Sequence, residues 1–285
     1  MKSRALNWSV VLLTSSMTVV KIAICVKQVP DSWAEKKMVD GRLDRQSVDA
    51  VLNDLDEYAI EEALRIVEPL NEGKESPEHT ITLISMGPDR ATEAIRKGLS
   101  MGADNGILVS DDALVGSDAI ATSKVLADVI SKNGFDLVFC GTESTDARMS
   151  VIPAMLAERL GFAQLTFAGS VKVDVGAKSV EIARMTDSGV ETMSAQFPCV
   201  ISVIEKINEP RYPSFKGIMA AKKKEIKTTS LSEIGISAGE VGVSGAWSIV
   251  EGAEPRPARA KGIKVEDGGD GGAKLADFLV EKRLA

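Results

Sequence analysis

Three short polar loops hold the residues best suited to bind a ligand. They are residues 25–31 (CVKQVPD), 53–56 (NDLD) and 141–146 (GTESTD), and each adjoins a segment that reads as a buried strand or an amphipathic helix. Glycine and small hydroxyl residues between a strand and a helix let backbone N–H groups point at a phosphate, and the helix dipole adds about half a positive charge. The third loop therefore favours an anionic nucleotide. Ser, Thr and Asp are also ordinary helix caps, so a purely structural role stays open.

Other reactive side chains are few. His79 is the single histidine, and the three cysteines, Cys25, Cys140 and Cys199, are widely spaced with no CxxC pair. Histidine is the commonest metal ligand and the commonest general base, and this chain has one, which argues against zinc sites and hydrolytic triads. Neither a GxGxxG nor a GxxxxGK[ST] motif is present. The sequence therefore predicts nucleotide binding without hydrolysis, with no metal site and no bond-making catalytic residue.

Composition narrows the class of protein further. The 285 residues are 44% hydrophobic and 26% charged, which is typical of one large or two small globular domains. The net charge of −7 argues against a nucleic-acid partner, because capture of phosphate backbones needs surplus positive charge. No apolar segment reaches the ~20 residues of a membrane span, so we expect no membrane insertion. Cysteines without a disulfide pattern fit a reducing cytoplasm.

The order of elements predicts the fold. Four short runs are apolar on both faces, as strands of a helix-covered parallel sheet are, and they span residues 19–26, 80–85, 106–110 and 136–140. Helix-period segments lie between and after them. This alternation predicts an α/β protein with a doubly wound, mainly parallel sheet and right-handed crossovers. Ligands of such sheets lie beyond the carboxyl ends of the strands where the strand order reverses, which is where the three polar loops fall.

A different pattern follows residue 170. Two strand-like runs, residues 179–185 and 198–205, flank the turn sequence Asp187-Ser188-Gly189, which predicts a hairpin at the edge of the sheet.

The apolar density falls near the C-terminus, and this suggests three parts of the chain. We expect an N-terminal extension of residues 1–18, a nucleotide-binding α/β domain of residues 19–227, and an extended C-terminal arm of residues 228–285. The arm ends in a short amphipathic helix with Leu275, Phe278 and Leu279 on one side. Such a face is usually kept because it docks on something, and another subunit is the expected surface.

Five segments resemble the β subunit of electron transfer flavoproteins, in the same order and spacing. They are KIAICVKQVPD (residues 21–31), NDLDEYAIEEA (53–63), MGPDRATEAIRKGLSMGA (86–103), GTESTD (141–146) and NEPRYPSFKGIMAAKKK (208–224). The last is the most specific, and it is preceded by the pattern Arg184…Asp187…Gly189…Glu191…Pro198. The resemblance covers residue 21 to the C-terminus. It implies an adenine-nucleotide α-hydrolase-like version of the predicted fold.

The resemblance also implies cofactors and partners. The β subunit pairs with an α subunit that holds most of an FAD, contributes a wall of the flavin pocket and buries a structural AMP. Position by position, the implied AMP contacts are Cys25, Asn53, Asp54, Leu55, Asp56, Met86, Gly141, Thr142, Glu143, Ser144, Thr145 and Asp146. Arg184 is implied to face the flavin. Without the family, core packing explains Cys25 and Met86 equally well, and a solvated strand position is the alternative for Arg184.

The segment of residues 208–224 resembles the family's recognition loop for partner dehydrogenases. The implied recognition residues are Asn208, Glu209, Pro210, Arg211, Tyr212 and Phe215, with Phe215 as the apolar anchor. A phenylalanine folded back on its own domain is the alternative.

Two departures from the family pattern concern the sites. Residues 147–153 (ARMSVIP) replace a more acidic and amide-rich continuation of the third loop, where Arg148 could contact phosphate or lie on the surface. Met185 stands where the family often has Glu, which puts an ion pair near the flavin in doubt.

The implied function is an electron carrier of the cytoplasm. It accepts electrons from dehydrogenases, such as those of fatty acid oxidation that act on acyl-CoA, and passes them to a quinone-linked membrane oxidoreductase. Two alternatives stay open: a non-redox adenine-nucleotide-binding module, and a flavin-bifurcating relative with a second FAD in place of AMP.

Overall fold

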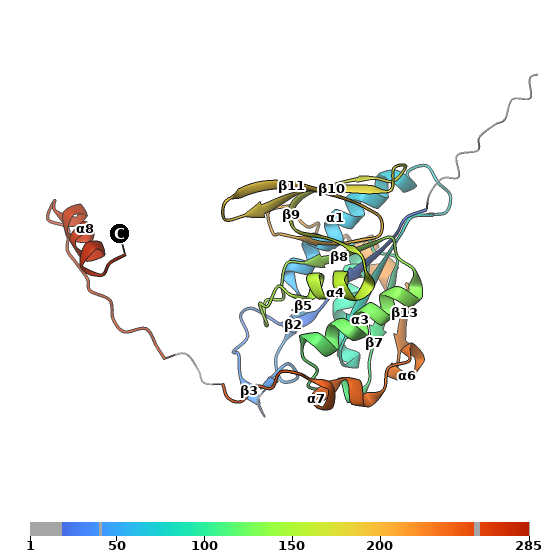
Figure 1. The fold of residues 1–285 in the computed structure, drawn as a ribbon, viewed down its shortest axis with the longest axis horizontal. Coiled ribbons are helices and arrows are strands. Elements are labelled where there is room, and N and C mark those ends of the chain that lie inside the picture. Colours follow the sequence, from blue (N-terminus) through green and yellow to red (C-terminus); the bar gives the residue numbers. More distant parts are fainter. Residues whose placement is uncertain (1–18, 40–41, 254–256, 285) are drawn as a thin grey trace, which may run out of the picture. The chain divides into compact units, whose positions relative to one another are not determined.

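The computed structural model describes residues 19–39, 42–253 and 257–284. A mixed sheet of nine strands runs through the described part of the chain (Figure 1). In spatial order the strands are β11 (Gly189–Gln196), β10 (Ser179–Thr186), β9 (Ala163–Asp174), β12 (Cys199–Val203), β8 (Leu137–Gly141), β1 (Lys21–Cys25), β6 (Thr80–Met86), β7 (Asn105–Val109) and β13 (Ile226–Thr229). Two small ribbons pair β2 (Gln28–Pro30) with β5 (Ala50–Leu52), and β3 (Met38–Val39) with β4 (Arg42–Leu43).

Helices cover both faces of this sheet. One face packs against α1 (Asp54–Asn71), α2 (Thr92–Met101) and the end of α5 (Phe215–Ala221), and the other against α3 (Ala119–Asn133), α4 (Ile152–Leu160) and α6 (Leu231–Ile234). The remaining helices are short or lie near the C-terminus: η1 (Asp89–Ala91), η2 (Asp112–Leu114), η3 (Ala238–Glu240), α7 (Gly242–Gly245) and α8 (Gly271–Glu281). In Figure 1, α3 and α4 lie in front of the sheet and α1 behind it.

The central strand β1 shows why this sequence makes a two-sided sheet. Successive side chains of a strand point to opposite faces. Ile22 and Ile24 accordingly join the core under α1 and α2, while Ala23 and Cys25 join the core under α3 and α4. Because Ile22 to Cys25 are all apolar and buried, this strand requires helices on both sides. The prediction of a doubly wound, mainly parallel sheet is confirmed.

The edge hairpin is confirmed, but one of its predicted strands is wrong. The turn at Asp187-Ser188 joins β10 to β11, whereas residues 199–203 form β12, a fully buried strand parallel to both β9 and β8. Strand β11 (GVETMSAQ) is exposed along most of its length. Because β11 lies at the edge of the sheet and is mostly exposed, it has no run of apolar residues that would identify it as a strand from the sequence.

The boundary predicted at residue 228 lies too early. Residues 226–229 are β13, the last strand of the sheet, and Leu231, Ile234, Ile236 and Val241 are buried in the core on the α3 side. The compact unit extends to Glu251, and a second unit follows from Gly252. The apolar residues of 231–241 are separated by polar ones, yet they pack onto the α3 side of the sheet. Because the apolar density of this stretch is low, the sequence alone did not indicate that it belongs to the core.

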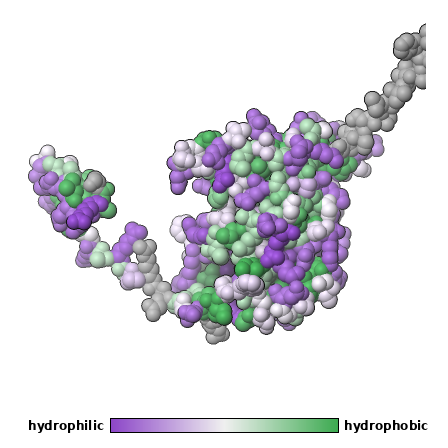
Figure 2. All heavy atoms as spheres, viewed as in Figure 1, coloured by the Kyte–Doolittle hydropathy of each residue, from purple (hydrophilic) through white to green (hydrophobic). Residues whose placement is uncertain are grey.

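The second unit ends in the amphipathic helix α8. None of its described residues is buried within that unit, and Leu275, Phe278 and Val280 are exposed. Figure 2 shows hydrophobic and hydrophilic residues next to one another on this helix. The predicted extension of residues 1–18 lies outside the described residues. Within the part of the chain that is described, no helix combines the length and hydropathy that a membrane crossing needs.

Candidate functional site

The three polar loops meet at the point where the strand order reverses. The chain leaves β1 toward β6 and β7 and then returns to β8 on the other side of β1, so the carboxyl ends of β1 and β8 lie side by side. Asn53, directly before α1, joins two of the loops: its Nδ2 donates to the Glu143 carbonyl at 3.0 Å and its Oδ1 accepts from the Thr145 N–H at 3.0 Å. The convergence of these loops, expected from the topology, is therefore seen in the structure.

A buried carboxylate ties the first loop to the third. The Asp146 side chain is almost fully buried and accepts from Lys27 Nζ at 2.7 Å and from Arg45 Nη2 at 2.6 Å. Lys27 Nζ also donates to Ser144 Oγ at 3.2 Å. Although burial opposes ionisation, the two cations and these hydrogen bonds hold the pKa of Asp146 at about 2. Arg45 was not predicted; it lies 101 residues from Asp146, and no local pattern points to such a pair.

Close packing places the start of α1 against the end of β8. A side chain at Gly141 would come within 2.7 Å of Asp56 Oδ1 and of the Leu55 carbonyl carbon, so only glycine permits this approach. Asp56 is buried, and its carboxylate accepts from the Lys27 N–H at 2.8 Å and from Asn53 Nδ2 at 2.9 Å. Burial outweighs these bonds and raises the pKa of Asp56 to about 7.

The free energy of unfolding should fall as the pH rises from about 4 to about 7. The folded chain keeps a proton on Asp56 that the unfolded chain has already released, because the pKa is about 7 in one state and 3.8 in the other. This stabilising contribution is complete below the unfolded pKa and is lost as the pH passes the folded one. Between about pH 5 and pH 7, the free energy of unfolding should therefore fall by about 2–3 kcal/mol.

The test compares urea unfolding of the natural protein and of Asp56→Asn at both pH values. Asparagine keeps a carbonyl oxygen for the Lys27 N–H but does not titrate, so most of the decline should disappear. An unchanged decline in the variant would show that other carboxylates cause it.

The first turn of α4 has backbone N–H groups that can donate hydrogen bonds to a ligand. Val151 precedes this nine-residue helix, and no side chain caps its first N–H groups. The approach to it is unusual, because Arg148 and Ser150 have φ of 50° and 55°, in the left-handed region. Ser150 Oγ donates to Glu143 Oε2 at 3.0 Å. The Arg148 side chain is 70% exposed, and among the described residues its ion partner is Glu143 at 3.9 Å. An exposed arginine and the uncapped N–H groups of Ile152 and Ala154 suit a phosphate, whereas Pro153 between them has no N–H.

The predicted nucleotide residues lie around this one edge of the sheet. Cys25 ends β1 beside Cys140, and Met86 ends β6; both contact the core on the α3 side. Thr142 Oγ1 donates to the Val203 carbonyl at 2.6 Å and so fixes the third loop to β12. Asp54 is exposed and Leu55 half-buried at the start of α1. Packing and loop anchoring account for several of these residues in the free chain.

Arg184 occupies a separate place, on the edge hairpin. Its guanidinium carbon lies 5.7 Å from the centre of the Phe167 ring, and Nη1 lies 3.9 Å from Met193 Sδ. The β9–β10 register shifts beside it, between Ala183 and Arg184. Its Nε is buried without a hydrogen-bond partner among the described residues. A half-buried arginine with an unused N–H can donate a hydrogen bond to an acceptor atom outside this chain.

The predicted recognition residues divide into two sets. Tyr212 and Phe215 are exposed, at 94% and 80% of their surface, and Glu209 is exposed as well. Phe215 was expected on a loop, but it is the first residue of α5, after the capping Ser214. Its exposure rules out the alternative of a side chain folded back on its own domain. Asn208 and Arg211 instead bond to α1.

A family model matches the part of the chain that holds most of these sites. The model described as "Electron transfer flavoprotein domain" matches residues 40–234, which is more than half of the chain and includes most of the nucleotide loops and the recognition residues.

Individual relatives match over nearly their whole lengths. The electron transfer flavoprotein subunit beta of Mycobacterium tuberculosis is 48% identical over 266 residues, which cover 92% of this chain and 98% of that protein. The protein of the same name in Megasphaera elsdenii is 35% identical over 276 residues, covering 93% and 98%. Protein FixA of Azotobacter vinelandii is 35% identical over 255 residues, covering 86% and 88%.

Proposed function

This chain belongs to the β-subunit family of electron transfer flavoproteins, and we propose that it works as the β subunit of a heterodimer that carries electrons between other proteins. The α subunit holds most of an FAD at the interface, and this chain adds part of the flavin pocket. Electrons come from flavin dehydrogenases such as those that oxidise acyl-CoA, and go to a quinone-linked oxidoreductase at the membrane. The carrier makes and breaks no substrate bonds and acts in the cytoplasm.

The meeting of the three loops at Asn53, whose side chain bonds to Glu143 and Thr145 and whose N–H donates to the Lys27 carbonyl at 2.9 Å, is the observation that best supports a nucleotide in this chain. We propose that AMP lies there, with its phosphate at the uncapped start of α4 and beside Arg148. Lys27 and Arg45 are held by Asp146, so they support the loop rather than the phosphate. The chain's single histidine, His79, accepts from the Val20 N–H, at the opposite end of β1 from these loops. The proposed role of the AMP is structural.

Arg184 supports the assignment of the edge hairpin to the flavin pocket. Bound FAD supplies the redox chemistry. The unused Nε–H of Arg184 fits an acceptor atom of such a group, and its positive charge favours added negative charge nearby. The exposed apolar side of α8 supports docking of the C-terminal arm, now counted from Gly252, on the α subunit.

Cofactor stoichiometry tests this function. We expect the purified heterodimer to release one FAD and one intact adenosine monophosphate on acid denaturation, both measured by chromatography against protein concentration. No flavin would favour a non-redox nucleotide-binding module. Two FAD and no AMP would favour a flavin-bifurcating relative. Either result would contradict the single-AMP carrier.

A further inference from the structure

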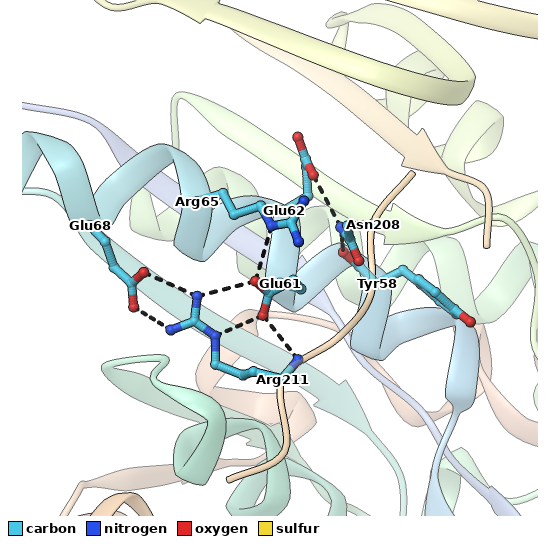
Figure 3. Close-up of polar contacts among 7 residues, drawn as sticks. All are labelled: Tyr58, Glu61, Glu62, Arg65, Glu68, Asn208 and Arg211. Atoms are coloured by element: carbon cyan, nitrogen blue, oxygen red, sulfur yellow. Dashed lines mark hydrogen bonds and ion pairs between the residues drawn. The ribbon is translucent and has the colours of Figure 1, made fainter. Parts of the chain in front are cut away.

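Arg211 is bonded to two carboxylates of one helix. Its Nε donates to Glu61 Oε2 at 2.7 Å, and its Nη1 and Nη2 donate to the two oxygens of Glu68 at 2.5 and 3.0 Å. The backbone N–H of Arg211 also donates to Glu61 Oε2 at 3.2 Å. Figure 3 shows the guanidinium lying between the two glutamates along α1.

This ion cluster is unlike an ordinary surface pair. The Glu61 side chain is only 5% exposed, and it also accepts from Arg65 Nε at 3.1 Å. Burial opposes ionisation of Glu61, but the bonds from Arg211 and Arg65 keep its pKa below the ordinary value. Paired, bidentate arginine contacts with a buried carboxylate have a fixed geometry, whereas exposed lysine pairs do not.

A second contact fixes the same stretch of chain three residues earlier. Asn208 Nδ2 donates to the Tyr58 carbonyl and to Glu62 Oε2, both at 3.0 Å. Asn208 and Arg211 thus hold the irregular segment before α5 across successive turns of α1 (Figure 3).

The far end of the segment is held by α2. Gly217 lies so close to the Ser100 carbonyl that a side chain there would approach its oxygen to 2.5 Å. Arg96 Nη1 donates to the Ala221 and Lys224 carbonyls, and Lys224 Nζ donates to the Ala103 carbonyl at 2.6 Å. Lys224 is therefore a structural residue rather than part of a free lysine run. Tyr212 and Phe215 project from a segment that is anchored on both sides.

We infer that Arg211 is a positioning residue: by gripping Glu61 and Glu68 it holds the start of α5 so that Phe215 is presented to a partner protein in one orientation. This rests on the proposed function, which makes Phe215 the partner anchor. The Arg211 guanidinium makes four hydrogen bonds to Glu61 and Glu68, because its Nη2 also donates to Glu61 Oε1 at 3.2 Å, so little of it is left to contact the partner directly. Preorganising an exposed anchor reduces the entropy that binding must otherwise remove.

A double-mutant cycle on the heterodimer separates positioning from direct contact. The measured quantity is the concentration at which the carrier half-saturates an acyl-CoA dehydrogenase. Arg211→Ala should raise this half-saturating concentration about tenfold in the natural background. In a Phe215→Ala background it should raise it less than about twofold, because alanine at position 215 offers no large side chain whose orientation matters for binding. Arg211→Lys keeps the charge without the fork and should give an intermediate effect. Turnover at saturation and the flavin spectrum should not change.

Glu72→Gln is the matched control, since this carboxylate follows α1 and has no ion pair among the described residues. If Arg211→Ala fails to fold, Glu68→Gln replaces it; this change removes only the half-exposed outer carboxylate and should raise half-saturation a few-fold. Additive effects of Arg211 and Phe215 would overturn the inference, as would an Arg211→Ala or Glu68→Gln variant with unchanged half-saturation. If Phe215→Ala itself has no effect, the recognition role of the segment fails together with the inference.

Discussion

Replacing Phe215 by alanine is expected to raise the half-saturating concentration of the carrier for an acyl-CoA dehydrogenase by about 30- to 700-fold. This corresponds to the 2–4 kcal/mol that truncation of a buried interface anchor usually costs. Phe215 is 80% exposed in the free chain, so it has apolar surface available to bury against a partner. The flavin spectrum and the AMP content should stay unchanged, because Phe215 contacts neither candidate cofactor site.

Two controls distinguish loss of partner binding from loss of stability. Val115→Ala truncates another exposed apolar side chain, in a loop away from α5, and should leave coupling to the dehydrogenase unchanged. The melting temperature of Phe215→Ala should also match that of the natural protein, since a mostly exposed ring contributes little packing. Loss of stability without loss of coupling would mean that Phe215 supports the fold instead of the partner.

Asn53→Ala is expected to release most of the AMP that we propose to bind beside it, and to lower the free energy of unfolding by about 2–4 kcal/mol. Asn53 is buried, and its amide bonds to Glu143, Thr145 and Asp56. Alanine leaves the Thr145 N–H and the Glu143 carbonyl without this partner, and each buried group that loses its bond costs about 1–3 kcal/mol. The third loop should then lose the shape that holds the nucleotide. Acid-release chromatography and urea unfolding measure the two effects.

Asn71→Ala provides a matched control at the other end of the same helix. Asn71 also bridges a loop, donating to the His79 carbonyl at 2.9 Å and accepting from the Glu78 and His79 N–H groups at 3.2 Å. Its loss should destabilise the fold to a similar extent but leave AMP bound, because this end of α1 lies at the start of β6. Release of AMP from both variants would attribute the loss to general destabilisation.

Local pattern predicted the sheet but not all of its strands. The runs around Ile22, Leu83, Leu108 and Val138 lie in strands that are buried on both faces, so apolar continuity alone located them. Strand β9, between β10 and β12, was not predicted, because buried and exposed residues alternate along its second half. The edge strand β11 was not predicted either, because it is exposed along most of its length; residues 198–205 were assigned to the hairpin in its place. Strand β13 has only Ile226 and Thr229 turned inward, which is too little for a periodic signal.

The candidate sites were predictable to different degrees. Loop composition and topology together located Asn53, Asp56 and the third loop, since parallel strands bring their carboxyl ends to one edge. The identity of the nucleotide, and the roles of Arg184 and Phe215, depended on the family resemblance. Arg45 and the clamp of Arg211 on Glu61 could not be predicted, because they join residues 101 and 150 positions apart through tertiary contacts alone.

The place of β1 at the centre of the sheet has a consequence for biosynthesis. β1 pairs on one side with β6 and on the other with β8, so it is enclosed once Gly141 has been made. The helix start at Asn53, the loop of residues 141–146 and the first turn of α4 are all present soon afterwards, whereas the edge hairpin and residues 208–224 come later along the chain. Because chains fold from the N-terminus as they are synthesised, a growing chain can assemble its nucleotide edge before its recognition segment exists. If the proposed AMP binds at this edge, its concentration during translation affects the folding yield of this chain before the chain pairs with any other protein.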